Sequence, residues 1–273
     1  MANQLGIDIG GTGIKGAVVD LKNGEFKEER FRVLTPQPAT PDAVAGVVNE
    51  IVQHFNWKGS VGATFPAVVQ KGMVHTAANV DASWIETDAA AIFSKATGRN
   101  CTVINDADAA GIAEVRFGAA KDVKGTVIVV TLGTGIGSAV FLDGNLLPNT
   151  ELGHLEINGK DAEKKASEVA RERDQLSWKK WSKRVERYLQ HLEALLWPDL
   201  IVIGGGISKK SEKFLPLIST RTKVVPALLH NEAGIVGAAL AAEYYRRSFG
   251  GAATNIDSCD ARRFSWSSRY FRG

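Results

Sequence analysis

The chain has 273 residues, 44% of them hydrophobic, so it can form one or two domains with buried cores. A net charge of only +3 does not demand a nucleic-acid partner, and Cys101 and Cys259 lie too far apart for a CxxC motif or a disulfide framework. The start lacks a secretion signal and no apolar run reaches about 18 residues, so we expect a cytoplasmic protein without a membrane span.

The first half of the chain predicts alternating strands and helices. Apolar runs bounded by glycine or proline indicate strands, and apolar residues three or four positions apart indicate helices. In chain order we predict strands within 5–34, a helix over 41–55, a strand at 61–65, a helix over 85–98, a strand at 103–104 and a helix over 107–117.

The second half repeats this alternation and ends in a different composition. We predict a strand over 125–131, a charged helical region over 159–197, strands at 200–203 and 224–225, and an alanine-rich helix over 234–245. Beyond about residue 246 the periodicity is lost, and we predict an irregular tail to which we assign no function.

One octapeptide nearly repeats: GTGIKGAV at Gly11–Val18 returns 122 positions later as GTGIGSAV at Gly133–Val140. Each copy predicts a strand, a Gly-Thr-Gly turn and a returning strand. Glycine lets backbone N–H groups approach an anion, and threonine adds a hydroxyl donor. The pair of turns predicts an internally duplicated α/β protein whose cleft binds phosphate from both sides, and therefore phosphoryl transfer.

Six motifs occur together in an order that resembles the ROK sugar kinases of the actin and hexokinase-like superfamily. The resemblance covers roughly residues 4–245 and is strongest to polyphosphate glucokinases and polyphosphate/ATP glucomannokinases. The motifs are LGIDIGGT at 5–12, NDADAA at 105–110, TLGTGIG at 131–137, ELGH at 151–154, VIGGGIS at 202–208 and NEAGIVGAA at 231–239.

The resemblance implies a two-lobed actin/hexokinase-like (ribonuclease H-like) duplicated α/β fold with an interlobe cleft. We expect a smaller N-terminal α/β lobe over 1–111 for sugar and phosphate, and a larger C-terminal α/β lobe over 112–246 for phosphate, nucleotide and a basic helix. The tail would cover 247–273, and the last helix is a candidate to pack back on the N-terminal lobe. A homodimer is expected by resemblance alone.

Asp106 is the candidate general base. A sugar hydroxyl is a poor nucleophile, and a carboxylate at a strand end can take its proton as it attacks phosphorus. Asn105 beside it could hydrogen-bond the same sugar. The competing interpretation is that the Asn-Asp pair simply caps the following helix, but the two glycine turns and the match to the family's catalytic aspartate favour the functional one.

Glu151 and His154 match the pair that holds the sugar in the family, and such hydrogen bonds reject analogues that lack a hydroxyl. Many family members place this histidine on zinc with a cysteine-rich loop, but 155–170 contain no cysteine, so we expect no zinc. Glu163 and Asn79 are further sugar-binding candidates by resemblance. An interpretation of Glu163 as a solvated helix residue is equally compatible with the sequence.

The phosphate and metal candidates lie at the two glycine turns. Asp8, at the end of the first strand, could hold Mg²⁺ directly or through water. Lys15 has no counterpart in the second copy, which suits a phosphate partner, although an ordinary exposed lysine is the alternative. The phosphate-binding set is Gly10, Gly11, Thr12, Gly13 and Lys15 in the first copy and Gly133, Thr134 and Gly135 in the second.

Gly204, Gly205, Gly206 and Gly234 resemble the family's nucleotide-binding glycines. A Gly-Gly-Gly turn is also compatible with close packing between a strand and a helix, so the nucleotide role depends on the resemblance.

Residues 176–198 predict a helix with a basic stripe. An apolar face is most simply core, and a basic face is usually just solvated. The sharper hypothesis is that the stripe, with Lys209, Lys210 and Lys213, guides inorganic polyphosphate by salt-sensitive Coulombic attraction. The stripe consists of Lys180, Lys183, Arg184 and Arg187.

Together these features predict a Mg²⁺-dependent kinase that phosphorylates the 6-hydroxyl of glucose, with mannose as a second candidate, from polyphosphate or ATP. A sugar-responsive regulator of the same family would need a helix-turn-helix domain before Leu5. An actin-like nucleotide-binding scaffold would not need the Asn105-Asp106 and Glu151-His154 pairs. A Rossmann dehydrogenase would need a G-x-G-x-x-G turn opening a helix after the first strand.

Overall fold

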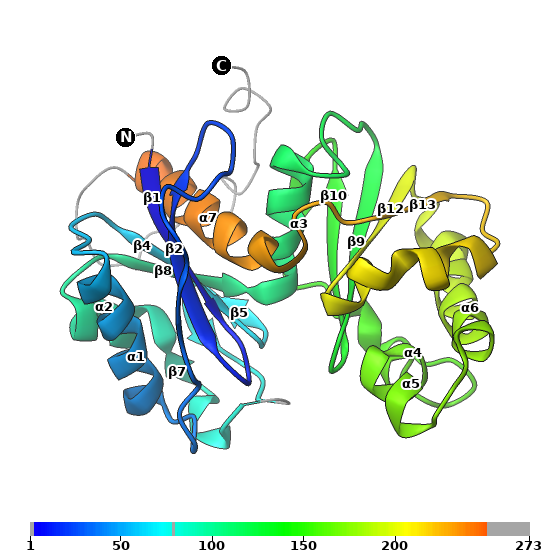
Figure 1. The fold of residues 1–273 in the computed structure, drawn as a ribbon, viewed down its shortest axis with the longest axis horizontal. Coiled ribbons are helices and arrows are strands. Elements are labelled where there is room, and N and C mark those ends of the chain that lie inside the picture. The colour runs from blue at the N-terminus through cyan, green and yellow to red at the C-terminus, as the bar shows by residue number, and fades with distance from the viewer. Residues whose placement is uncertain (1–2, 78–79, 250–273) are drawn as a thin grey trace. The chain divides into compact units, whose positions relative to one another are not determined.

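The computed structural model describes residues 3–77 and 80–249, which form two α/β units (Figure 1). One unit contains the chain up to Ala113 together with the segment that begins at Glu232, and the other runs from Glu114 to Asn231. Of the tail predicted from residue 247, residues 247–249 are described and still belong to the last helix; the remainder lies outside the described residues.

A five-stranded sheet in the order β3-β2-β1-β4-β8 forms the centre of the first unit. β2 is antiparallel to β1, whereas β4 and β8 run parallel to β1 and to each other. The carboxyl ends of β1, β4 and β8 therefore meet at one edge, where ligands bind in open α/β sheets. The strands are β1 (Asn3–Ile9), β2 (Ile14–Asp20), β3 (Phe31–Val33), β4 (Val61–Phe65) and β8 (Cys101–Asn105).

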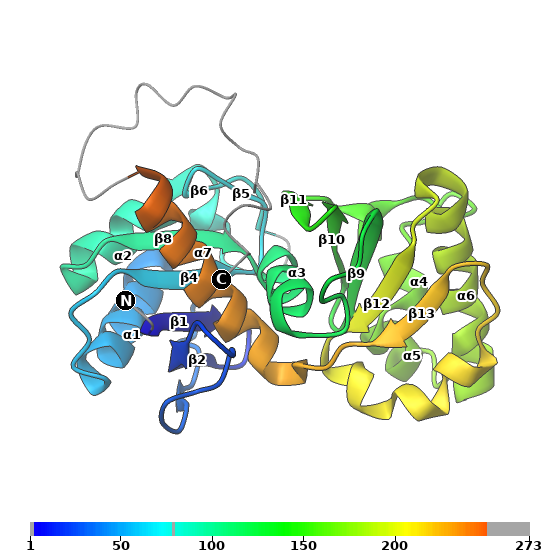
Figure 2. The same cartoon turned by 90° about the horizontal axis from the view of Figure 1, so that it is seen from above.

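Helices cover both faces of this sheet (Figures 1 and 2). α1 (Pro41–His54) and α2 (Ala89–Thr97) share a core with the strand residues whose side chains face them. α7 (Ala233–Phe249) lies on the opposite face, to which Gly6 and Gly62 belong. A methyl group at either glycine would overlap a backbone carbonyl of α7, so these two positions need glycine for the helix to rest directly on the strands.

The second unit repeats the topology of the first. Its sheet has the order β11-β10-β9-β12-β13, with β10 antiparallel to β9 and with β12 and β13 parallel to β9. The same antiparallel-then-parallel pattern in both units confirms the predicted duplicated α/β fold. The strands are β9 (Thr126–Leu132), β10 (Ile136–Leu142), β11 (Asn145–Leu147), β12 (Leu200–Gly204) and β13 (Lys223–Pro226).

The charged region predicted as helical over 159–197 is three helices: α4 (Glu163–Ala166), α5 (Glu168–Arg173) and α6 (Trp178–Leu196). Two serines cause the breaks. The Ser167 hydroxyl accepts the N–H of Ala170 at 3.1 Å, and the Ser177 hydroxyl accepts that of Lys180 at 3.3 Å. Each serine thereby caps the start of a new helix.

The helix predicted over 85–98 begins late, at Ala89, because the Asp88 carboxylate accepts the Ala91 N–H at 2.8 Å and caps α2 there. The residues before it belong to a small antiparallel sheet and a short 3₁₀ turn that periodicity did not predict. These elements are β5 (Val69–Gln70), β6 (Met73–Val74), η1 (Ala82–Trp84) and β7 (Thr87–Asp88).

The chain leaves the first unit through α3 (Asp106–Phe117), which begins in that unit and ends in the second. It returns just before α7. Within residues 3–77 and 80–249, none of the helices combines the length and apolar character that a membrane crossing needs.

Candidate active site

Asn105 and Asp106 lie where β8 gives way to α3. Asn105 is only 7% exposed: its Oδ1 accepts the N–H groups of Ala107 at 2.8 Å and Asp108 at 3.0 Å, and its Nδ2 donates to the Ala67 carbonyl at 3.0 Å. Asn105 therefore caps α3 and ties it to the loop after β4. Asp106 is exposed, with Oδ1 accepting the Ala107 N–H at 2.8 Å. The cap is thus largely the work of Asn105, and the Asp106 carboxylate is presented at the sheet edge.

The first glycine turn joins β1 to β2 and is closed by its own backbone. The N–H of Gly10 donates to the Gly13 carbonyl at 3.2 Å, and the Thr35 hydroxyl donates to the Gly10 carbonyl at 2.5 Å. Thr12 is exposed, and its carbonyl accepts a hydrogen bond from the Arg32 guanidinium at 3.3 Å. Sequence reasoning missed Thr35 and Arg32, which reach this turn from 20 or more residues away along the chain.

Asp8 and Lys15 face each other directly across β1 and β2. The Asp8 Oδ2 and Lys15 Nζ lie 3.6 Å apart, and the Thr64 hydroxyl donates to Asp8 Oδ1 at 2.9 Å. Gly234, at the start of α7, lies against the same carboxylate. Mg²⁺ is usually held by one or two carboxylates together with waters and substrate phosphates, so a single, partly exposed carboxylate next to a glycine turn fits this ion.

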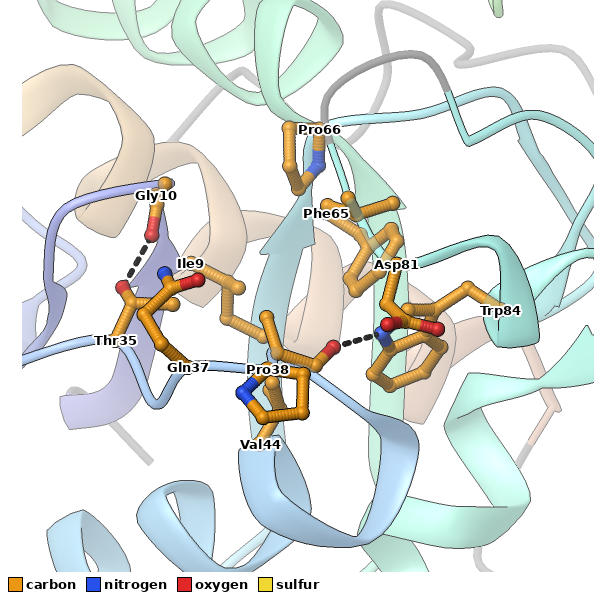
Figure 3. Close-up of a pocket in the computed structure, with 13 residues that line it drawn as sticks. Ile9, Gly10, Thr35, Gln37, Pro38, Val44, Phe65, Pro66, Asp81 and Trp84 are labelled. Atoms are coloured by element: carbon orange, nitrogen blue, oxygen red, sulfur yellow. Dashed lines mark hydrogen bonds between the residues drawn. The ribbon is translucent and has the colours of Figure 1, made fainter.

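A pocket of about 220 Å³ opens beside the first glycine turn in the same unit (Figure 3). The Trp84 ring forms part of its wall and is fixed by a hydrogen bond from Nε1 to the Ala39 carbonyl at 2.8 Å. Val80 also lines the pocket, but the predicted sugar ligand Asn79 lies outside the described residues. The lining combines Ile9, Pro38, Val44, Phe65 and Trp84 with Gly10, Gly11, Thr35, Gln37 and Asp81.

The second unit brings together three of the predicted sugar ligands. His154 Nε2 lies 3.7 Å from Glu151 Oε2, and His154 Nδ1 lies 3.9 Å from Glu163 Oε1. Sequence reasoning missed Asp161, whose Oδ2 lies 3.8 Å from His154 Nδ1 and also pairs with Lys164 at 2.9 Å. The ligand atoms of His154, Asp161 and Glu163 lie within 4.8 Å of one another, so this cluster could hold hydroxyl groups or a cation.

The electrostatics of this cluster centre on Glu151. Although 39% of its side chain is exposed, burial raises the pKa of the Glu151 carboxyl, an effect that the positive charge of His154 opposes and the negative charge of Glu163 reinforces. A carboxylate that is costly to ionise accepts hydrogen bonds from sugar hydroxyls readily, because each such bond replaces lost water.

The second glycine turn is joined to the same cluster. The N–H of Gly133 donates to the Gly135 carbonyl at 3.0 Å, and Thr134 is exposed. Glu163 lies over the turn, with its Oε2 accepting the N–H of Ile136 at 3.3 Å. Glu163 therefore touches both the candidate sugar ligands and the candidate phosphate turn of this unit.

The Gly-Gly-Gly turn after β12 has a packing explanation at its central residue. Gly205 has φ +82°, and a Cβ there would lie 2.5 Å from the Leu132 carbonyl oxygen and 2.9 Å from its nitrogen. Only glycine fits this close contact with β9. The nucleotide role predicted for Gly204, Gly205, Gly206 and Gly234 stays a prediction.

The amphipathic pattern of α6 is confirmed: Trp181, Val185, Leu189 and Leu192 are buried. The basic stripe is partly committed to other groups, since Arg184 donates to Asp174 at 2.6 Å, Arg187 to Asn158 at 3.1 Å, and Lys183 to Glu186 at 3.4 Å. Hydrogen bonds from Arg173 and Arg184 hold the pKa of Asp174 well below its usual value. Within the part of the chain that the structure describes, Lys180 is the stripe residue whose ammonium group has no ion-pair partner.

Comparison with known proteins places the chain among sugar kinases. Residues 4–167 match the sequence profile of the ROK family. The chain is 53% identical over 238 residues to the polyphosphate glucokinase of Mycobacterium tuberculosis (strain CDC 1551 / Oshkosh), a match that spans 87% of this chain and 90% of the relative.

Two solved structures have the same fold. The inorganic polyphosphate/ATP-glucomannokinase from Arthrobacter sp. strain KM superposes with a TM-score of 0.86 at 56% identity, covering 89% of this chain and 99% of that one. A ROK family glucokinase from Streptomyces griseus, solved with glucose and AMPPNP, gives a TM-score of 0.77 at 25% identity, covering 89% and 99%.

Proposed function

Because this chain belongs to the ROK family, we propose that it transfers the terminal phosphoryl group of inorganic polyphosphate or ATP to the 6-hydroxyl of glucose, with mannose as a second candidate acceptor. The observation that carries the proposal is the exposed Asp106 carboxylate at the edge where three parallel strands end. The likeness to a polyphosphate glucokinase and to a polyphosphate/ATP-glucomannokinase supports the choice of donor and acceptor.

Asp106 would act as the general base. Its Oδ1 accepts the N–H of Ala107, and its carboxylate would receive the proton of the attacking sugar hydroxyl. Asn105 contributes by holding the turn that presents Asp106, since both ends of its amide are bonded to the backbone. The proton moves from the hydroxyl to the carboxylate as the oxygen attacks phosphorus.

The sugar and the donor would be held by the other candidate groups. Glu151, His154 and Glu163 can accept from and donate to sugar hydroxyls, which orients the ring and rejects acceptors that lack a hydroxyl. The exposed Thr12 and Thr134 turns can donate backbone and hydroxyl hydrogens to phosphate oxygens. Asp8 would hold Mg²⁺, which when bound neutralises charge on the transferred phosphoryl group.

The protein would recognise polyphosphate by its charge rather than by its shape. It has no base to recognise, so attraction to exposed lysines such as Lys180, Lys209 and Lys210 would be its main source of affinity. Because carboxylates pair with Arg184 and Lys183, whereas Arg187 is bonded to a neutral amide, we assign this attraction first to Lys180 and Arg187.

A coupled assay for glucose 6-phosphate, run with Mg²⁺ and either ATP or polyphosphate, tests the proposal. Turnover with polyphosphate would support both the kinase and its donor. Turnover with ATP alone would support the kinase and reduce the basic stripe to a solvated face. Absence of turnover with either donor on glucose and mannose would contradict the proposal and favour an actin-like nucleotide-binding scaffold.

A further inference from the structure

Thr64 is a fully buried threonine at the carboxyl end of β4, beside the strand that carries Asp8. Its hydroxyl accepts the N–H of Ile9 at 3.0 Å and donates to Asp8 Oδ1 at 2.9 Å. The Thr64 oxygen accepts the Ile9 N–H through a lone pair, so the single proton of the hydroxyl remains to be donated to the Asp8 carboxylate. Thr64 thus fixes one oxygen of Asp8 from inside the sheet.

The other oxygen of Asp8 faces the Lys15 ammonium at 3.6 Å. A relaxed, charge-assisted hydrogen bond between these groups would be about 2.7–2.9 Å long. On a third side lies the start of the 17-residue helix α7, where a Cβ on Gly234 would come within 2.7 Å of Asp8 Oδ1. The carboxylate is therefore restrained by a hydroxyl and a helix terminus while it forms a long ion pair with the lysine.

We propose that Thr64 is a positioning residue for the phosphoryl donor: it keeps the ion pair between Asp8 and Lys15 long, so that both groups stay available to the donor phosphates and their metal ion. This inference rests on the proposed function, in which Asp8 and Lys15 act at the donor. Without the hydroxyl, the carboxylate can rotate toward the ammonium group and shorten the ion pair, which leaves each group less available to the donor.

Thr64→Val and Thr64→Ser test this role. Valine keeps the shape but removes the hydroxyl, and we expect kcat/KM for the donor to fall about ten-fold or more while the KM for glucose changes less than about two-fold. Serine keeps the hydroxyl, so donor kinetics should stay within about three-fold of wild type. Calorimetric binding of tripolyphosphate with Mg²⁺ should weaken in Thr64→Val and recover in Thr64→Ser.

A purely structural role would give a different result. In that case Thr64→Val would lower the melting temperature but leave donor kinetics and tripolyphosphate binding unchanged, which would overturn the inference. Thr64→Ala provides the same comparison if the valine variant does not fold. Wild-type protein without turnover on either donor would overturn the proposed function and this inference with it, whereas wild-type turnover with unaffected Thr64 variants overturns the inference alone.

Discussion

Replacing Glu114 by alanine should destabilise the second unit by about 3–5 kcal/mol. Glu114 is 1% exposed, and its carboxylate accepts three backbone N–H groups: Leu229 at 2.8 Å on Oε1, and Ala119 at 2.8 Å and Leu228 at 3.1 Å on Oε2. Hydrogen bonds to a charged group contribute about 1.5–3 kcal/mol each, and the released burial cost of the charge offsets part of their sum. Glu114→Gln keeps one acceptor oxygen and should cost about 2 kcal/mol.

Urea unfolding followed by circular dichroism would measure these changes, with Glu28→Gln, a substitution at an exposed carboxylate, as the matched control. Hydrogen exchange of the Ala119 and Leu229 amides would show whether the loss of stability is local to the backbone groups that Glu114 binds. A Glu114→Ala midpoint equal to that of the control, with unchanged exchange at these amides, would refute the reasoning.

Substitutions at three further places, Gly205, His154 and the basic stripe, have distinct expected outcomes. Gly205→Ala should cost about 2–4 kcal/mol of unfolding free energy, measured in urea, because the site combines φ +82° with contact to a neighbouring backbone carbonyl; a neutral effect would contradict this packing. His154→Gln removes the charge that lowers the Glu151 pKa, so this pKa should rise further and the acid limb of kcat/KM for glucose should move to higher pH; an unmoved limb would argue against Glu151 as a sugar ligand. Lys180→Ala should weaken polyphosphate binding about two- to five-fold at low salt and leave it unchanged at about 1 M salt. Arg184→Ala should mainly lower the melting temperature, because Arg184 is paired with Asp174. Equal losses of polyphosphate binding in both variants would show that Arg184 binds polyphosphate as well.

Most of the fold could be predicted from local sequence patterns. The two Gly-Thr-Gly turns and the alternating apolar runs predicted the duplicated α/β architecture because each strand and turn is specified by neighbouring residues. The same is true of the Asn105-Asp106 step, where a strand end and a helix start are adjacent in sequence. Ser167 and Ser177 are residue types that commonly cap helices, so the sequence held a signal for the two breaks. The charged pattern runs on through both serines, and we therefore predicted one continuous helical region.

What the sequence could not reveal are contacts between distant positions. Glu114 looks like an ordinary polar helix residue, yet two of its partners lie 114 and 115 positions away. The Thr64 contact to Asp8 spans 56 positions and depends on the register of β4 beside β1. For Arg184, the sequence predicted the face of α6 on which it lies but not its partner Asp174.

The most direct test of Asp106 as the general base is the rate of glucose 6-phosphate formation by Asp106→Asn with each donor. Asparagine keeps the shape and an oxygen for the Ala107 N–H, but it cannot take the proton of the sugar hydroxyl. We expect kcat to fall by about 10²–10⁴-fold with both polyphosphate and ATP, with an unchanged melting temperature. An Asp106→Asn variant that retains a kcat close to that of the wild type would show that another group takes the proton.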